Sequence, residues 1–337
     1  MRVLLTGASG FIGTHVCAEL AAQGAEVTAF CRTQPSAWAN AADWFGGDIT
    51  DRAALARAMR GHEAVVHAAA LYSYERCDQP LMRAVNVEGT RNVLLESAAA
   101  GVRRVLITSS SATCGPVHGR PATERDAPPD WEMCVPYKRT KVAAEELAMA
   151  AARDGMDVLC VNPTTVIGEG DRRPTPSGKM VRDIVERPVN AYLRQGGINV
   201  VPVVDVARGH ALALAHGRRR ERYILGGENL TLRETFAIVL AEVGRPAPRW
   251  PLPWSAVYGV SLAVDMAFRA IGREPRLINR DEVRLSRTPL YFSSEKASHE
   301  LGYAPSSATA ALSRAARWFA RRRNYGTTLG RVPVPAH

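Results

Sequence analysis

Tyr137 and Lys141 are the two residues whose types and spacing most directly suggest chemistry. They stand four positions apart in a helix expected over residues 136–153, so both side chains project from one helical face. A free tyrosine has a pKa near 10, and lowering it to about 7 requires roughly 4 kcal/mol of preferential stabilisation of the phenolate. A neighbouring ammonium and a second nearby positive charge can supply it. The pair therefore predicts proton transfer by Tyr137, assisted by Lys141.

A run of hydroxyl residues follows the strand expected at 104–109. Thr108 and Ser109 lead into Ser110, and the carboxyl edge of a parallel sheet is where a substrate carbonyl would lie. Ser110 is therefore a candidate to orient a carbonyl oxygen. A serine that only caps its own strand end is the alternative interpretation.

Three glycines stand between an apolar run at 2–6 and a helical pattern at 11–23. Gly7 suits a tight turn, Gly10 allows a pyrophosphate to approach the backbone, and Gly13 lets the helix lie close to the strand. The free N–H groups at the start of the helix favour phosphates. This strand–turn–helix pattern predicts a dinucleotide-binding loop.

The end of the second expected strand, at 26–31, indicates which dinucleotide is bound. NAD-specific sites place an acid there for the ribose 2′-hydroxyl, whereas an arginine accommodates a 2′-phosphate. The residue at this point is Arg32, whose planar guanidinium suits a phosphate. The predicted cofactor is NADP, used as NADPH, in preference to NAD.

Strand and helix patterns alternate through the first 160 or so residues. This alternation predicts an α/β fold with a Rossmann doubly wound parallel sheet, joined to a smaller, mostly helical substrate domain. The expected Rossmann domain is 1–168, to which 198–217 return. The expected substrate domain is 169–197 with 218–325, followed by a tail at 326–337.

Composition narrows the functional classes. The chain has 337 residues, 23% of them charged, and a net charge of +10, which alone would allow nucleic-acid or membrane binding. The arginines are spread along the chain without an aromatic-interleaved basic module, so no nucleic-acid role is predicted. No segment is both long enough and free enough of charge to predict a membrane-spanning helix. Scattered cysteines without a CxxC pair predict reduced thiols, a cytoplasmic protein and no metal site.

The helix expected at 254–271 carries an apolar stripe. Its members are Val257, Val260, Val264, Phe268 and Ile271. The first interpretation is packing on its own domain. The alternative is peripheral association with a membrane surface, or a gate for an apolar substrate, although Asp265 argues against insertion.

Together these motifs resemble the extended short-chain dehydrogenase/reductases of the NAD-dependent epimerase/dehydratase superfamily. The matching segments run in family order: 6–13, 47–51, 66–70, 86–90, 108–110, Tyr137 with Lys141, and 162–168. The resemblance implies that Ser110, Tyr137 and Lys141 are catalytic. It also implies a set of cofactor-binding residues: Gly7, Gly10, Phe11, Ile12, Gly13, Arg32, Asp48, Ile49, Ala68, Ala69, Ala70, Thr108, Tyr137, Lys141, Pro163, Thr164, Thr165 and Val166.

Within this superfamily, segments 174–179 and 223–230 are similar to the branch labelled hopanoid-associated sugar epimerase. That branch resembles dihydroflavonol 4-reductases in its arginine after the second strand. Typical sugar-nucleotide epimerases of this fold carry an acid where Arg32 stands. Pro202 also occupies a position where histidine is common.

The candidate substrate residues are less specific. Tyr72 and Tyr74 follow the cofactor-lining alanines and suit a flat apolar ligand or a stacked sugar ring, or ordinary packing. Ser110 would contact the reacting group. Lys179 and Tyr192 are candidates for the far wall.

The predicted function is that of an NADP-dependent oxidoreductase that reduces a ketone or aldehyde, or oxidises the alcohol, with Tyr137 as acid/base. The alternative is an NAD(P)-dependent nucleotide-sugar epimerase or dehydratase. A non-catalytic cofactor sensor would be expected to lose Tyr137 or Lys141, and both are present. The resemblance also implies a homodimer through the helices at 81–100 and 136–153, whose many alanines allow close approach.

Overall fold

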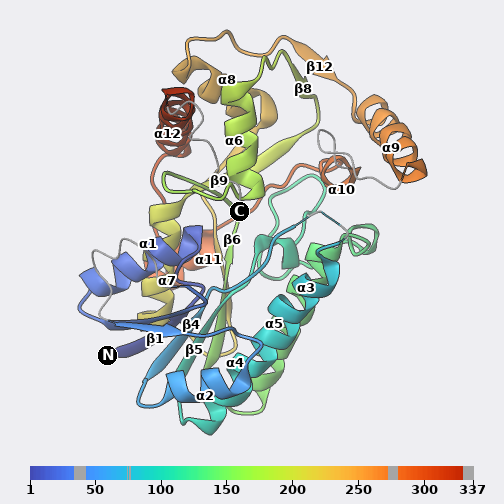
Figure 1. The fold of residues 1–337 in the computed structure, drawn as a ribbon. Coiled ribbons are helices and arrows are strands. Elements are labelled where there is room, and N and C mark those ends of the chain that lie inside the picture. Colours follow the sequence, from blue (N-terminus) through green and yellow to red (C-terminus); the bar gives the residue numbers. More distant parts are fainter. Residues whose placement is uncertain (34–42, 74, 76, 272–279, 329–337) are drawn as a thin grey trace, which may run out of the picture.

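The computed structural model describes residues 1–33, 43–73, 75, 77–271 and 280–328. Its central feature is a seven-stranded sheet in the order β10-β6-β5-β4-β1-β2-β3, with every neighbouring pair parallel (Figure 1). Its strands are β1 (Arg2–Thr6), β2 (Glu26–Cys31), β3 (Asp43–Gly46), β4 (Ala64–His67), β5 (Arg104–Thr108), β6 (Val158–Pro163) and β10 (Arg222–Leu225). Their largely apolar sequences suit a sheet that is covered on both faces.

Helices cover the two faces of this sheet. One layer contains α1 (Phe11–Ala22), α7 (Val203–His216) and α11 (Glu295–Leu301). The other contains α2 (Arg52–Met59), α4 (Gly89–Ala99) and α5 (Pro136–Arg153). Each layer buries its own apolar cluster against the sheet, which confirms the predicted doubly wound α/β architecture.

A second group of elements lies beyond the carboxyl ends of the central strands (Figure 1). A three-stranded sheet contains β11 (Glu228–Thr231), β9 (Gly197–Pro202) and β7 (Thr165–Ile167). Beside it pack α6 (Pro176–Glu186), α8 (Leu232–Glu242) and α12 (Ala308–Thr328). The short strands β8 (Ala191–Leu193) and β12 (Trp250–Leu252) pair with each other, and α9 (Trp254–Ala270) contacts α10 (Arg280–Leu285).

Two strands differ from the sequence-based predictions. The strand expected near Asn199 is β9, and it lies in the smaller sheet. Conversely, β10 falls within the segment assigned to the second domain, yet it pairs with β6 at the edge of the central sheet. Local sequence patterns identify a strand but not its partner, because pairing depends on residues distant in the chain.

Two helix boundaries also differ. The helix predicted at 81–100 starts with α3 (Gln79–Arg83) and passes through a π-helical turn at Ala84–Glu88 before α4. At the other end of the chain, α12 continues through Thr328, so the predicted tail at 326–337 begins as helix. The remainder of that tail, 329–337, lies outside the described residues.

A homodimer through α4 and α5 remains a prediction. The two helices contact each other on one face of the sheet, and Leu95 of α4 is a large apolar side chain that is about half exposed. We expect light scattering after size exclusion to give the mass of two chains at micromolar concentration. A mass near one chain across a tenfold dilution series would contradict the dimer.

Candidate functional site

The glycine loop between β1 and α1 has the geometry that a dinucleotide requires. Gly7 has a φ of +70°, and a Cβ there would lie 2.5 Å from the nitrogen of Ala69. A Cβ on Gly13 would lie 2.2 Å from the carbonyl oxygen of Gly7, so this glycine lets α1 pack on the loop. Gly10 caps α1 without a side-chain hydrogen bond, and the first turn holds no acid. The start of α1 therefore fits the pyrophosphate of a dinucleotide.

Ser110, Tyr137 and Lys141 meet at the carboxyl end of β5. Pro136 starts α5, where its missing N–H costs no helical hydrogen bond, and Tyr137 follows in the first turn. The Ser110 side chain lies next to the Tyr137 phenol, and both line the same cavity. Lys141 Nζ donates to the Thr108 carbonyl oxygen at 2.8 Å. The structure thus brings the three predicted catalytic residues together.

The Tyr137 ring is covered by a second aromatic side chain. Tyr72 stacks on it with ring centroids 3.9 Å apart and an interplanar angle of 21°. Burial raises the pKa of Tyr137 to about 12, although the neighbouring Ser110 hydroxyl opposes the change. This direction is opposite to the lowering that the sequence predicts from Lys141 together with a second positive charge. The phenol is therefore protonated at neutral pH unless another positive charge lies beside it.

Lys141 is held in a buried position. Burial lowers its pKa to about 8, and the nearby Glu145 carboxylate opposes the change. The hydroxyl of Thr108, a predicted cofactor residue, is turned to His210 Nε2 at 2.9 Å. Thr108 therefore positions Lys141 through its carbonyl group, while its side chain joins β5 to α7.

His67, at the end of β4, links three elements below the cofactor loop. Its Nδ1 lies 2.7 Å from Thr6 Oγ1 and its Nε2 lies 3.1 Å from Thr90 Oγ1. Because the Thr90 hydroxyl already donates to the Asn86 carbonyl oxygen, it accepts from Nε2–H, and Thr6 donates to Nδ1. Burial lowers the pKa of His67 to about 3. A neutral imidazole therefore fixes the start of the 68–70 segment.

We expect His67 and His210 to make the fold sensitive to mild acid. Burial also lowers the pKa of His210 to about 4. In the unfolded chain a histidine has a pKa near 6.5, so below that pH it takes up a proton that the folded chain does not bind. The free energy of unfolding therefore falls as the pH decreases from about 6.5 toward the folded-state pKa. Each histidine should remove about 2 kcal/mol of unfolding free energy between roughly pH 7 and pH 5.

Urea titrations at the two pH values measure this loss. His210→Gln should have a pH dependence smaller by about 2 kcal/mol than that of the wild type. His299→Gln is the matched control, because that side chain is 77% exposed. An unchanged pH dependence in His210→Gln would contradict the expectation.

The adenosine end of the loop is marked by Arg32 and Asp48. Arg32 is exposed after β2 and forms no ion pair within the part of the chain that the structure describes. Partial burial acts to raise the pKa of Asp48. Hydrogen bonds from Thr50 and attraction to Arg32 outweigh this effect and hold the pKa below its ordinary value. Ile49 is buried beneath Gly89, where a Cβ would lie 2.3 Å from its Cδ1. Arg32 and Asp48 therefore lie close to each other, and a ribose site beside Arg32 stays a prediction.

A cavity of about 650 Å³ joins the catalytic residues to the second group of elements. Its reactive side includes Phe11, Ile12, Tyr72, Ser109, Ser110, Tyr137, Lys138 and the 163–166 segment. The opposite wall is largely apolar and is formed by Met180, Ile184, Val189, Leu193, Ile198, Leu232, Phe236, Val283, Leu285, Leu290 and Phe292. The Oγ of Ser109 is buried and has no hydrogen-bond partner in the described part of the chain.

The predicted substrate residues are placed differently from one another. Tyr72 and Lys179 line the cavity. Tyr192 does not, whereas its neighbour Leu193 does, because successive side chains of β8 point to opposite sides. Tyr74 lies outside the described residues.

Asn86 is a site residue that the sequence interpretation quoted but gave no role. Its amide oxygen accepts from Leu71 N at 2.8 Å, and its Nδ2 donates to the Leu71 carbonyl oxygen at 2.9 Å. The same Nδ2 donates to Thr140 Oγ1 at 3.0 Å. Asn86 therefore ties the segment that carries Tyr72 to the helix that carries Tyr137. Its place in the π-helical turn depends on backbone geometry that no residue pattern identified.

A buried polar cluster behind Ser110 was also missed. Asn162 Nδ2 donates to the Ser110 carbonyl oxygen at 3.1 Å and to Glu145 Oε2 at 2.6 Å. Arg222 of β10 forms an ion pair with Glu145 Oε1 at 2.8 Å. These residues lie on β6, α5 and β10, so their meeting depends on the sheet order.

Lys138, directly after Tyr137, forms a buried ion pair with Glu132. Its Nζ also donates to the Gly115 carbonyl oxygen at 2.7 Å. Burial lowers the pKa of Lys138 and raises that of Glu132, and the pairing opposes both changes. The pair fixes the turn before α5.

In the described residues, no group of three His, Cys, Asp or Glu side chains could hold a metal ion.

Comparison with known proteins decides the family. A family model described as the NAD dependent epimerase/dehydratase family matches residues 3–226, which contain the glycine loop, Ser110, Tyr137 and Lys141. The chain belongs to this family. It is therefore an oxidoreductase of the short-chain dehydrogenase/reductase superfamily that uses a nicotinamide dinucleotide.

Relatives of this family member include reductases. A putative dihydroflavonol 4-reductase of Synechocystis sp. is 36% identical over 323 residues, or 94% of this chain and 93% of that protein. Sterol demethylase protein B of Methylococcus capsulatus is 33% identical over 327 residues, covering 96% and 99% of the two chains. The crystal structure of gox2253 has a TM-score of 0.83 and 38% identity, covering 96% of this chain and 98% of that one.

Proposed function

We propose that the enzyme is an NADP-dependent oxidoreductase that reduces a ketone or aldehyde on a small apolar molecule, or oxidises the corresponding alcohol. The observation that carries this proposal is that Ser110 and Tyr137 line the same cavity as Phe11 and Ile12 of the dinucleotide loop. The hydroxyl groups of Ser110 and Tyr137 and the dinucleotide loop therefore border the same cavity, in which a substrate could bind.

The residues of this chain handle the proton and the orientation of the substrate. When bound, the nicotinamide supplies or accepts the hydride. Ser110 donates a hydrogen bond to the carbonyl oxygen, and Tyr137 transfers its proton to the same oxygen. Burial raises the pKa of Tyr137 to about 12, so the phenol is protonated at neutral pH, which is the state that an acid requires. Lys141 would hold the nicotinamide ribose and favour the phenolate that forms.

The cavity wall supports an apolar substrate. Its far side is lined mainly by aliphatic and aromatic side chains, which favour a ligand with little polar surface. Two relatives have names that refer to a dihydroflavonol and to a sterol, and both are ring compounds with extended apolar surface. The stacked Tyr72 would be displaced by, or stack upon, such a ligand.

A nucleotide-sugar epimerase is the second candidate. Lys179 and Arg187 line the same cavity, and two cations suit a diphosphate. The carboxylate of Glu282 lies close enough to Lys179 to attract it, which reduces the positive charge there. The apolar remainder of the wall therefore favours the carbonyl reductase.

A substrate screen with purified enzyme tests the proposal. We expect NADPH absorbance to fall with at least one class among steroid, flavonoid and β-keto ester ketones, and to stay constant with nucleotide sugars. Tyr137→Phe is the matched control for each active compound. Interconversion of nucleotide sugars by enzyme that retains its cofactor through purification, without net NADPH consumption, would establish the epimerase instead.

A further inference from the structure

Helix α9 buries two polar residues and leaves several of its apolar residues exposed. Its two buried residues are Ser261 and Asp265, with 0% and 5% of their surface exposed. Asp265 forms ion pairs with Arg269 at 2.7 Å and Arg280 at 3.5 Å. The pair with Arg269 lies within α9, and the pair with Arg280 attaches the helix to α10. In the apolar stripe, Val257, Val264 and Phe268 are half-buried, whereas Val260 is exposed and left for another contact.

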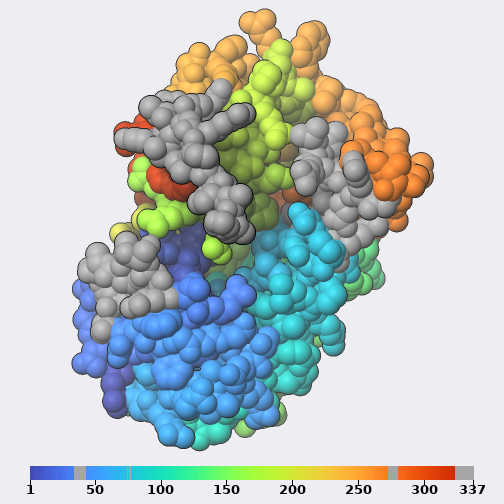
Figure 2. All heavy atoms as spheres, in the orientation of Figure 1, coloured from blue at the N-terminus to red at the C-terminus, as the bar shows by residue number. Residues whose placement is uncertain are grey.

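The outer face of α9 is apolar along its length. Three large apolar side chains are more than half exposed: Val260 at 54%, Met266 at 59%, and Ile271, just after the helix, at 63%. The exposed small residues Ala256, Ala263 and Ala267 lie on the same face. Figure 2 shows α9 in orange at the right edge of the molecule. Trp250 of β12, just before the helix, is 65% exposed. A soluble helix normally turns such a face to the core.

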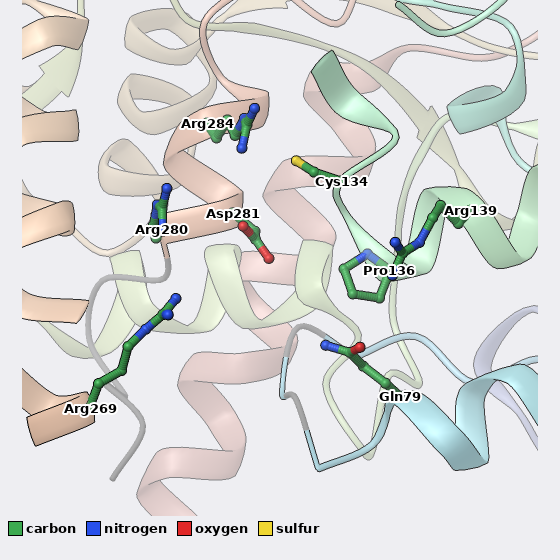
Figure 3. A pocket seen from close by; sticks show the side chains of 8 residues that line it. All are labelled: Gln79, Cys134, Pro136, Arg139, Arg269, Arg280, Asp281 and Arg284. Atoms are coloured by element: carbon green, nitrogen blue, oxygen red, sulfur yellow. The ribbon is translucent and has the colours of Figure 1, made fainter. Parts of the chain in front are cut away.

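Four arginines surround a cavity of about 220 Å³ at the C-terminal end of α9. Figure 3 shows Arg269, Arg280 and Arg284 on one side and Arg139 on the other. Arg139 and Arg284 form no ion pair with any residue that the structure describes. Asp281 is the one acid among the residues that line the cavity in the described part of the chain. Asp265 pairs with Arg269 and Arg280, so the excess positive charge of this cluster, which we call the arginine cavity, comes mainly from Arg139 and Arg284.

We propose that the outer face of α9, with Trp250 and the arginine cavity, docks on the surface of a membrane that contains anionic phospholipid. An apolar helical face bordered by arginines and a tryptophan matches the interfacial layer, where acyl chains meet charged headgroups. No helix in the described ranges is long and apolar enough to cross a membrane, so the contact is peripheral.

The charge favours lipid over a second copy of the chain. A symmetric dimer through this face would bring the same patch of both chains together, with their arginine cavities close to each other. Like charges across an interface are unfavourable, whereas lipid phosphates complement them. The net charge of +10 acts in the same direction.

Helix α10 connects this surface to the substrate cavity. Arg280 and Arg284 line the arginine cavity, while Val283 and Leu285 of the same helix line the large apolar cavity. Docking would therefore place the membrane beside the wall of the substrate site. The proposal does not depend on the substrate, because binding is measured without one.

Vesicle flotation tests the proposal with the full chain. We expect the wild type to float with phosphatidylcholine vesicles that contain phosphatidylglycerol, and to float less with phosphatidylcholine alone or at high salt. Val260→Asp should lower the partition coefficient about tenfold, and Met266→Gln is a milder second variant. Val204→Asp is the matched control, since Val204 is 45% exposed on α7.

The charge is tested separately. Arg284→Gln should weaken binding to the anionic vesicles about fivefold, while Arg321→Gln, an exposed arginine of α12 on the opposite side of the molecule, should not. All variants should keep the circular dichroism of the wild type. Absence of flotation by the wild type, or equal flotation of Val260→Asp and Val204→Asp, would overturn the proposal. A lipid-free dimer that Val260→Asp dissociates would assign this face to a second copy.

Discussion

Tyr137→Phe is expected to lower turnover by at least about a hundredfold while NADPH affinity stays within a factor of about two. The substitution removes the proton that the carbonyl oxygen must receive but keeps the ring that stacks on Tyr72. It also removes the hydroxyl that lies next to Ser110. Steady-state turnover and fluorescence titration with NADPH measure the two effects.

Tyr72→Phe is the control for this substitution. It removes a hydroxyl from the other ring of the same stacked pair and leaves the Ser110–Tyr137 contact in place. Its turnover should remain well above that of Tyr137→Phe. If Tyr137→Phe retained wild-type turnover with chemistry rate-limiting, another group would be the acid and the catalytic assignment would be wrong.

NADPH is expected to bind more tightly than NADH by roughly tenfold to a hundredfold. One charge-assisted contact between the Arg32 guanidinium and the 2′-phosphate is worth about 1.5–3 kcal/mol, which corresponds to that range. Asp48 lies close enough to Arg32 to attract it, which places the preference toward the lower end. Competitive fluorescence titration of the two cofactors measures the ratio.

Arg32→Ala should remove most of this preference by weakening NADPH binding, with little change for NADH. Arg57→Ala on α2 is the matched control, because Arg57 is also exposed and lies within a helix on the face of the sheet. Equal or tighter binding of NADH by the wild type would contradict the role given to Arg32.

The parts of the site that depend on local sequence were predictable. Gly13 is needed because a Cβ there would meet the carbonyl group of Gly7 in the same loop, and Gly7 because its φ is +70°, so both follow from the local strand–turn–helix geometry. Tyr137 and Lys141 share one helix turn, so their relation follows from helical geometry alone. The predicted helix at 136–153 agrees with the bounds of α5 for the same reason.

The supporting contacts depend on tertiary structure and were not predictable. Glu145 and Arg222 are 77 positions apart and meet only because β10 pairs with β6. Asn86 acts through a π-helical turn, which has no residue signature in this chain. The edge strand β3 was missed because it is four residues long and mostly exposed, without the apolar run of the buried strands.

The order of strands also governs how the chain leaves the ribosome. β6 is buried along its whole length, yet one of its edges is closed only by β10, after the chain has passed through β7, β9 and α7. At about 5–20 residues per second, the segment between β6 and β10 takes several seconds to synthesise. During that interval an apolar edge with unpaired backbone groups is open to pairing with other nascent chains. Its duration is determined by topology, so stronger packing elsewhere in the sheet would not shorten it.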